Sequence, residues 1–257
     1  MSKRIVLVKH NNDPNDDRAS LHLAARGFEL DWRYPYAGDS LPADDAEVAG
    51  TVVYGGGQGV PEMARFPFLA AEARWMKACT ERGIPTLGIC LGAQLLAHAH
   101  GAKVGPHPEG KQEFGFYDLE PTNEGAATIP AGMAVPQMHY HTFELPPGAT
   151  LLASSRDYRN QAMQVAEKAF GFQFHPEQSH ATFQRWQRKP WAPWGKPGVQ
   201  TREEQDAKAV QHDAGVGAWF TGFLDSITWR EQPGGQSTLA IRCEDIGREL
   251  GRKGART

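Results

Sequence analysis

A cysteine stands between two glycines at the point where an apolar run gives way to a helical pattern. The segment 88–94 reads GICLGAQ and follows the compact apolar run 84–89. Small neighbours allow a strained turn that lifts the Cys90 side chain out of a sheet, and the N-terminus of the next helix favours the thiolate. The backbone N–H of Leu91 would then face an oxyanion. The pattern predicts a nucleophile elbow. Taken alone, it also fits a buried cysteine in a packed corner.

A thiol nucleophile needs a base, and a second segment offers one. The apolar run 170–174 ends in His175, Pro176 and Glu177. If this run is a parallel strand, His175 leaves the sheet at the same edge as Cys90. Glu177 can turn back to orient the imidazole, as the third member of a triad does. By itself, His175 could equally be a histidine that packs a strand end.

Together these segments resemble the class I (triad) glutamine amidotransferases over about residues 1–225. GICLGAQ is similar to the family's nucleophile motif, and FHPE at 174–177 is similar to its His-Pro-Glu motif. The run VYGGG at 53–57 looks like the family's strand-to-glycine loop, although Gly57 stands where the family usually has proline. The resemblance implies a triad of Cys90, His175 and Glu177, with an oxyanion hole formed by the backbone N–H groups of Gly56 and Leu91.

Within the family, the chain most resembles free-standing proteins related to the glutaminase domain of GMP synthetase. The segment YHTFELP at 140–146 is similar to their substrate-holding loop, with tyrosine in place of tryptophan and a shorter stretch after the histidine. The resemblance implies that Tyr140 and His141 help to hold the amino-acid end of glutamine. Gln94, one helical turn after the nucleophile, is a further candidate for contact with the substrate, or it is a helix-face residue.

The elements that must position these residues alternate along the chain. Buried strands are predicted at 3–9, 48–54 and 84–89, a half-exposed outer strand at 28–32, and helices at 17–26, 67–82 and 91–100. Residues 102–175 indicate short antiparallel strands near 114–120, 150–153 and 161–167, before the strand 169–174 that delivers His175. Helical spacing returns at 178–187 and 203–227. We therefore expect a three-layer α/β fold with a mostly parallel central sheet and helices on both faces, flavodoxin-like and similar to the class I glutamine amidotransferases. Residues 1–229 would form the amidotransferase domain, and 230–257 a C-terminal extension.

The composition of the chain argues against several classes of partner. The chain has 257 residues and a formal net charge of −3, with 27 basic and 30 acidic residues, which argues against nucleic acid or an anionic membrane as partner. Three cysteines without a CxxC pair, and no signal-peptide core at the N-terminus, favour a cytoplasmic protein.

We expect no cofactor and no metal, although His139 and His141 share a face of an extended segment and could form a metal site with His10 or His107. The Trp-rich loop 186–198 could stack on bases, but such loops more commonly pack on their own domain or on a subunit partner.

The motifs therefore predict a glutaminase that releases ammonia and glutamate through a γ-glutamyl thioester. No phosphate-binding or pyrophosphatase-type loop is present to consume the ammonia. A separate synthetase subunit would then complete the reaction, and a homo-oligomer is the other expected assembly. Two alternatives stay open: a γ-glutamyl peptidase acting on glutathione-like conjugates, and a catalytically silent binding subunit.

Overall fold

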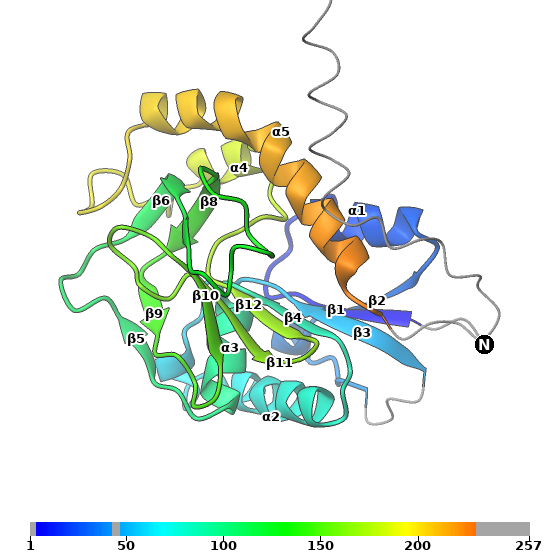
Figure 1. Cartoon of the computed structure of the whole chain (residues 1–257). Helices are drawn as coiled ribbons and strands as arrows, with labels where there is room; N and C mark the ends of the chain where they lie inside the picture. Colours follow the sequence, from blue (N-terminus) through cyan, green and yellow to red (C-terminus); the bar gives the residue numbers. More distant parts are fainter. Residues whose placement is uncertain (1–3, 43–46, 230–257) are drawn as a thin grey trace, which may run out of the picture.

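The computed structural model describes residues 4–42 and 47–229 and contains one eight-stranded sheet (Figure 1). The strand order is β2-β1-β3-β4-β12-β11-β10-β7. The first five strands run parallel, and each of the last three pairs antiparallel with the strand before it. The strands are β1 (Arg4–Val8), β2 (Glu29–Arg33), β3 (Val48–Val53), β4 (Thr86–Ile89), β7 (Glu120–Pro121), β10 (Thr150–Ser154), β11 (Ala162–Ala166) and β12 (Ala169–Phe172). The predicted mostly parallel α/β fold is confirmed, and the parallel part has the flavodoxin-like order.

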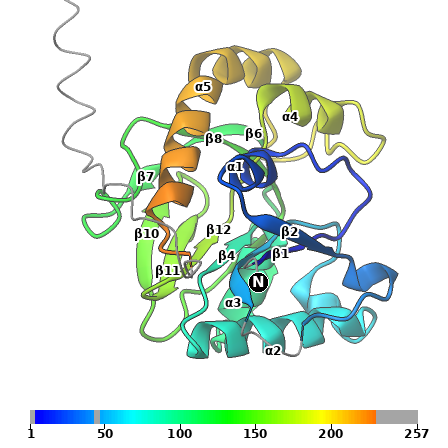
Figure 2. The same ribbon diagram turned by 90° about the vertical axis from the view of Figure 1, so that its right-hand side faces the viewer.

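Helices cover both faces of the sheet because the parallel strands are apolar on both sides. In β1, Ile5 and Leu7 belong to the core under α1 and α5, whereas Val6 and Val8 belong to the core under α2 and α3. Alternate residues of a strand point to opposite faces, so one continuous apolar run supplies both cores. Figure 2 shows this three-layer arrangement end on. The helices are α1 (Arg18–Ala25), α2 (Pro67–Glu81), α3 (Leu91–Ala99), α4 (His180–Gln187) and α5 (Arg202–Ser226), with 3-10 turns η1 (Pro35–Ala37) and η2 (Val60–Glu62).

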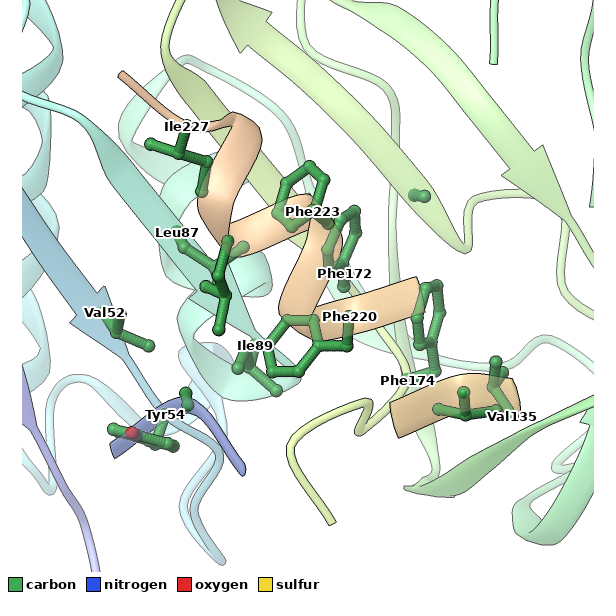
Figure 3. Packing of buried hydrophobic residues seen from close by; sticks show 14 of the residues in the cluster. Val52, Tyr54, Leu87, Ile89, Val135, Phe172, Phe174, Phe220, Phe223 and Ile227 are labelled. Atoms are coloured by element: carbon green, nitrogen blue, oxygen red, sulfur yellow. The ribbon is translucent and has the colours of Figure 1, made fainter. Parts of the chain in front are cut away.

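The long helix α5 closes one face with aromatic side chains (Figure 3). Phe220 and Phe223 are buried, and the ring centroid of Phe223 lies 4.9 Å from that of Phe172 on β12. Burying one phenylalanine contributes about 1.5–3 kcal/mol, so these contacts hold the strand that precedes His175. Thr201 and Glu204 form a capping box that starts the helix.

Two small antiparallel sheets lie beside the main one. β5 (Val104–Pro106) pairs with β9 (His141–Phe143), and β6 (Glu113–Asp118) pairs with β8 (Ala134–His139). The sequence indicated a strand at 114–120 but no partner at 134–139. Pro136 and the polar residues of β8 hide it from pattern analysis, because its stability comes from pairing with a distant segment.

The elements predicted in the parallel half agree with the structure to within one or two residues at their ends. The strand at 29–33 lies at the sheet edge, as its half-exposed pattern predicted. In the described ranges, no helix is both long and apolar enough to cross a membrane. The predicted extension 230–257 lies outside the described residues, so the division into two parts stays a prediction.

Candidate active site

Cys90 occupies a strained turn between β4 and α3. Its backbone has φ 51° and ψ −106°, and it is the only non-glycine residue with positive φ among residues 4–42 and 47–229. Such a conformation costs about 1–3 kcal/mol and persists only where the surrounding structure enforces it. The Cys90 N–H donates to the carbonyl oxygen of Phe172 on β12 at 2.7 Å, and the Cys90 carbonyl accepts the N–H of Gln94 at 3.0 Å. The predicted elbow geometry is therefore present.

The glycines on either side of Cys90 are required by close backbone packing. A β-carbon on Gly88 would lie 2.5 Å from the carbonyl carbon of Gly92, and one on Gly92 would lie 1.9 Å from the carbonyl oxygen of Val53. Any side chain at these positions would force α3 away from the sheet. The glycines thus set how sharply the chain turns at Cys90.

His175 and Glu177 form a buried pair at the end of β12. The imidazole Nδ1 lies 2.7 Å from Oε1 of Glu177, and both residues are almost fully buried. Burial opposes a charge on His175, but the Glu177 carboxylate and the neighbouring Cys90 outweigh it and raise the pKa of His175 to about 10. The N–H of His175 donates to the carbonyl oxygen of Pro136 at 2.8 Å, which fixes the strand end against β8.

Cys90 and His175 come together on one side of Gly55. A β-carbon on Gly55 would lie 2.8 Å from Cε1 of His175 and 3.3 Å from Cβ of Cys90. The Cys90 thiol donates to the carbonyl oxygen of Met138 at 3.7 Å, and its interaction with the imidazole is one of the causes of the raised pKa of His175. The structure therefore brings thiol, imidazole and carboxylate into one chain of contacts, which is the arrangement needed for covalent catalysis by cysteine.

A cavity of about 840 Å³ opens onto this centre, and every site residue predicted from the sequence lines it. Gly56 follows β3, and Leu91 is the first residue of α3, where a helix leaves backbone N–H groups without an intrahelical partner. The sequence-predicted site residues that line the cavity are Gly56, Cys90, Leu91, Gln94, Tyr140, His141, His175 and Glu177.

The three predicted substrate-binding side chains differ in their surroundings. Gln94 is buried, and its amide donates to Oε1 of Gln173 at 3.1 Å. Tyr140 is 41% exposed and lies at the cavity wall. His141 packs on Gly59, where burial lowers the pKa of its imidazole. Gln94 is thus already committed to a partner, whereas Tyr140 is open to solvent.

Two of the histidines that could have formed a metal site are paired with carboxylates instead. Nε2 of His139 pairs with Glu113 at 2.9 Å, whereas His10 pairs with Glu72 at 2.8 Å. His139 ends β8 and His141 begins β9, so they belong to different sheets. In the described part of the chain, no group of three His, Cys, Asp or Glu side chains is placed to hold a metal ion.

Several residues at the cavity were not singled out from the sequence as site residues. Arg185 forms a two-point ion pair with Asp16 at 2.6 and 2.8 Å, and Lys189 pairs with Asp13 at 3.1 Å, so α4 and the loop after β1 meet at the mouth. Trp186 stands edge-on to His175, with ring centroids 4.8 Å apart. Part of the Trp-rich segment thus packs on its own domain. Nothing local marks these pairs, because their members are far apart in sequence.

Several known proteins resemble this chain in sequence or in structure. The family model for class-I glutamine amidotransferases matches residues 23–187. The glutamine amidotransferase-like protein YfeJ of Salmonella typhimurium is 34% identical over 162 residues, which cover 59% of this chain and 66% of that protein. GMP synthase of Porphyromonas gingivalis is 33% identical over 153 residues, covering 58% of this chain but only 28% of the synthase. A glutamine amidotransferase from Thermotoga maritima has a TM-score of 0.78 at 26% identity, covering 89% of this chain and 99% of that one.

Proposed function

Since this chain belongs to the class-I glutamine amidotransferase family, we propose that it hydrolyses the side-chain amide of glutamine at Cys90. The observation that carries the proposal is the chain of contacts from Cys90 through His175 to Glu177, on a strained elbow at the cavity floor. The thiolate attacks the amide carbon and forms a C–S bond. The carbonyl electron pair moves onto oxygen, giving a tetrahedral oxyanion.

His175 supplies and removes the protons of this reaction. Its raised pKa keeps the imidazolium beside the thiolate, so that it can protonate the departing ammonia when the C–N bond breaks. The neutral ring then takes a proton from water, which attacks the γ-glutamyl thioester and releases glutamate. Glu177 holds Nδ1 and so keeps Nε2 available for these transfers.

Two backbone N–H groups are assigned to the oxyanion. Leu91 offers an N–H at the start of α3, and Gly56 offers one in the loop after β3. Donors fixed by the fold stabilise developing charge without reorganising, and losing one typically costs about 10²–10³ in kcat. Gln94, Tyr140 and His141 line the same cavity and are proposed to contact the amino-acid end of the substrate.

The size of the cavity favours γ-glutamyl peptides as a second candidate substrate class. About 840 Å³ lies in the upper part of the range of roughly 300–1,000 Å³ that is usual for small-molecule sites. Trp186 and Trp191 line it, and Trp191 is 49% exposed. This space could take an amine component larger than ammonia.

The ammonia acceptor is proposed to belong to a separate chain. This chain matches only 28% of the length of a GMP synthase. We propose that a separate synthetase chain takes the place of the rest of that enzyme. A protein that only supplied ammonia to a partner would release it slowly when isolated.

A turnover panel tests the proposed reaction. Glutamine, glutathione and γ-glutamyl anilide are incubated separately with the protein, and ammonia and glutamate are measured independently. Equal release of ammonia and glutamate from glutamine supports the glutaminase. Faster glutamate release from the γ-glutamyl peptide or anilide would assign the peptidase instead. If none turned over, the proposed reaction would be contradicted for the isolated chain.

A further inference from the structure

A buried pair of His10 and Glu72 lies next to the glycine loop. His10 follows β1, and its Nε2 lies 2.8 Å from Oε2 of Glu72 on α2. Both side chains are fully buried, and the ring of Phe68 stacks on His10 with centroids 6.3 Å apart. The imidazole therefore has one fixed orientation.

The other nitrogen of His10 reaches the loop. Its Nδ1 lies 3.3 Å from the carbonyl oxygen of Gly55. The carbonyl oxygen of Gly55 can only accept, so this contact is a hydrogen bond when Nδ1 carries the hydrogen. We take Nδ1 as the donor to Gly55.

This contact sets the direction of the next N–H. The peptide unit between Gly55 and Gly56 is planar and trans, so its carbonyl and its N–H point in opposite directions. A run of three glycines has more backbone freedom than any other tripeptide. Without the contact to His10, the peptide unit between Gly55 and Gly56 could therefore rotate at little energetic cost. Holding the Gly55 oxygen toward His10 holds the Gly56 N–H away from it.

The loop is confined from both sides. A β-carbon on Gly55 would meet His175 and Cys90, whereas one on Gly56 would lie 2.6 Å from Cβ of His10. The glycine peptide thus lies between the proposed catalytic pair and the buried His10.

We propose that His10, oriented by Glu72, is a positioning residue that fixes the Gly56 N–H of the oxyanion hole. The inference rests on the function proposed above. The contact between His10 and the Gly55 carbonyl should then affect the step in which charge develops on the substrate oxygen. It should affect neither substrate binding nor the reactivity of the Cys90 thiol.

Two substitutions separate the two ring nitrogens. Asparagine places an amide nitrogen near the position of Nδ1, and glutamine places one near Nε2. His10→Gln should keep the contact with Glu72 and lose the donor to Gly55, whereas His10→Asn should do the reverse. We expect His10→Gln to lower kcat for glutamine by about tenfold to a hundredfold, less than for complete loss of an oxyanion donor. KM should stay within about twofold, and His10→Asn should recover most of kcat.

Alkylation of Cys90 by iodoacetamide supplies the second readout, because that displacement develops no carbonyl oxyanion. Its rate should be the same in both variants and in the wild type. Met76→Ala removes a buried side chain one turn along α2 from Glu72 and serves as a control for loss of stability. It should lower the melting temperature without lowering kcat at a temperature where the protein is folded.

Full kcat in folded His10→Gln, or an equal loss in both His10 variants, would overturn the inference while leaving the proposed function intact. Absence of wild-type turnover would instead contradict the proposed function. Crystal structures of the two variants then decide the positioning claim by themselves. The Gly55 carbonyl should turn away from position 10 in His10→Gln and stay in His10→Asn, and an unchanged peptide in His10→Gln would overturn it.

Discussion

Gly55 faces the imidazole of His175 so closely that a β-carbon at this position would lie 2.8 Å from Cε1. The contact leaves no room for a side chain unless the imidazole moves. The loop after β3 and the histidine after β12 are therefore fitted to each other, although Gly55 and His175 lie 120 positions apart in the sequence.

Gly55→Ala should displace His175 and lower kcat by about tenfold to a thousandfold, because small misplacements of catalytic groups are costly. Gly57→Ala is the matched control in the same loop, since a β-carbon there meets no heavy atom within 4 Å. Steady-state kinetics of both variants test this expectation. Similar kinetics for the two variants would show that the close approach at Gly55 has no catalytic consequence.

Substitution of Cys90 separates chemistry from backbone strain. Cys90→Ala and Cys90→Gly should both abolish turnover, since neither carries a nucleophile. The glycine variant should be more stable than the alanine variant by about 1 kcal/mol, because glycine tolerates the φ of 51° at this position. Chemical denaturation measures the difference. A more stable alanine variant would mean that the elbow is not strained.

Covalent labelling distinguishes Cys90 from the other thiols. A glutamine-like diazo-ketone should add one equivalent at Cys90, as found by peptide mass mapping. Cys79 is buried in the core against α3, and Cys243 lies outside the described residues. Labelling at Cys79 or Cys243 instead of Cys90 would remove the nucleophile assignment.

Removing the proposed base, His175, should cost more than removing Glu177, which is proposed to orient it. His175→Asn should lose nearly all activity, about 10³-fold or more, whereas Glu177→Gln should keep a measurable fraction. The glutamine side chain can still accept a hydrogen bond from Nδ1, which is why part of the rate survives. Single-turnover rates of the two variants test the order. Equal losses would give the carboxylate a larger part in the reaction.

The raised pKa of His175 makes a prediction about pH. A pKa of about 10 means that the ring keeps its proton through neutral pH, whereas an ordinary histidine loses it near 6.5. In a ¹⁵N-edited NMR titration, the ring signals of His175 should stay in the protonated form between pH 6 and 8. Glu177→Gln removes the largest favourable charge and should move the midpoint to lower pH. A wild-type midpoint near 6.5 would contradict a protonated His175 at neutral pH.

Much of the parallel half of the fold could be predicted because its signals are local. Apolar runs of strand length, helical spacing and the glycines around Cys90 each lie within a few residues. The rule that parallel strands present their carboxyl ends at one edge then brings Cys90 and His175 together without any knowledge of packing. Glu177 could be predicted beside His175 because it follows only two residues later and a short turn brings it back to the imidazole.

The rest depended on contacts between distant segments. Strand β8 exists because it pairs with β6, and Glu72 lies 62 residues from His10. His10 itself carried a weak signal, since it follows the first buried strand at the edge where sites form. Its partner and its contact with Gly55 could not be read from the sequence, because they depend on how α2 packs on the sheet.

Trapping with hydroxylamine shows whether Cys90 carries the γ-glutamyl group of glutamine during turnover. The wild-type protein is mixed with glutamine, quenched in acid, and digested to find the acylated peptide, while a parallel sample is treated with hydroxylamine. We expect a γ-glutamyl adduct on the Cys90 peptide, released as γ-glutamyl hydroxamate and absent from Cys90→Ala. Glutamate formation by the wild type with no adduct on the Cys90 peptide and no hydroxamate, or an unchanged yield from Cys90→Ala, would contradict this expectation.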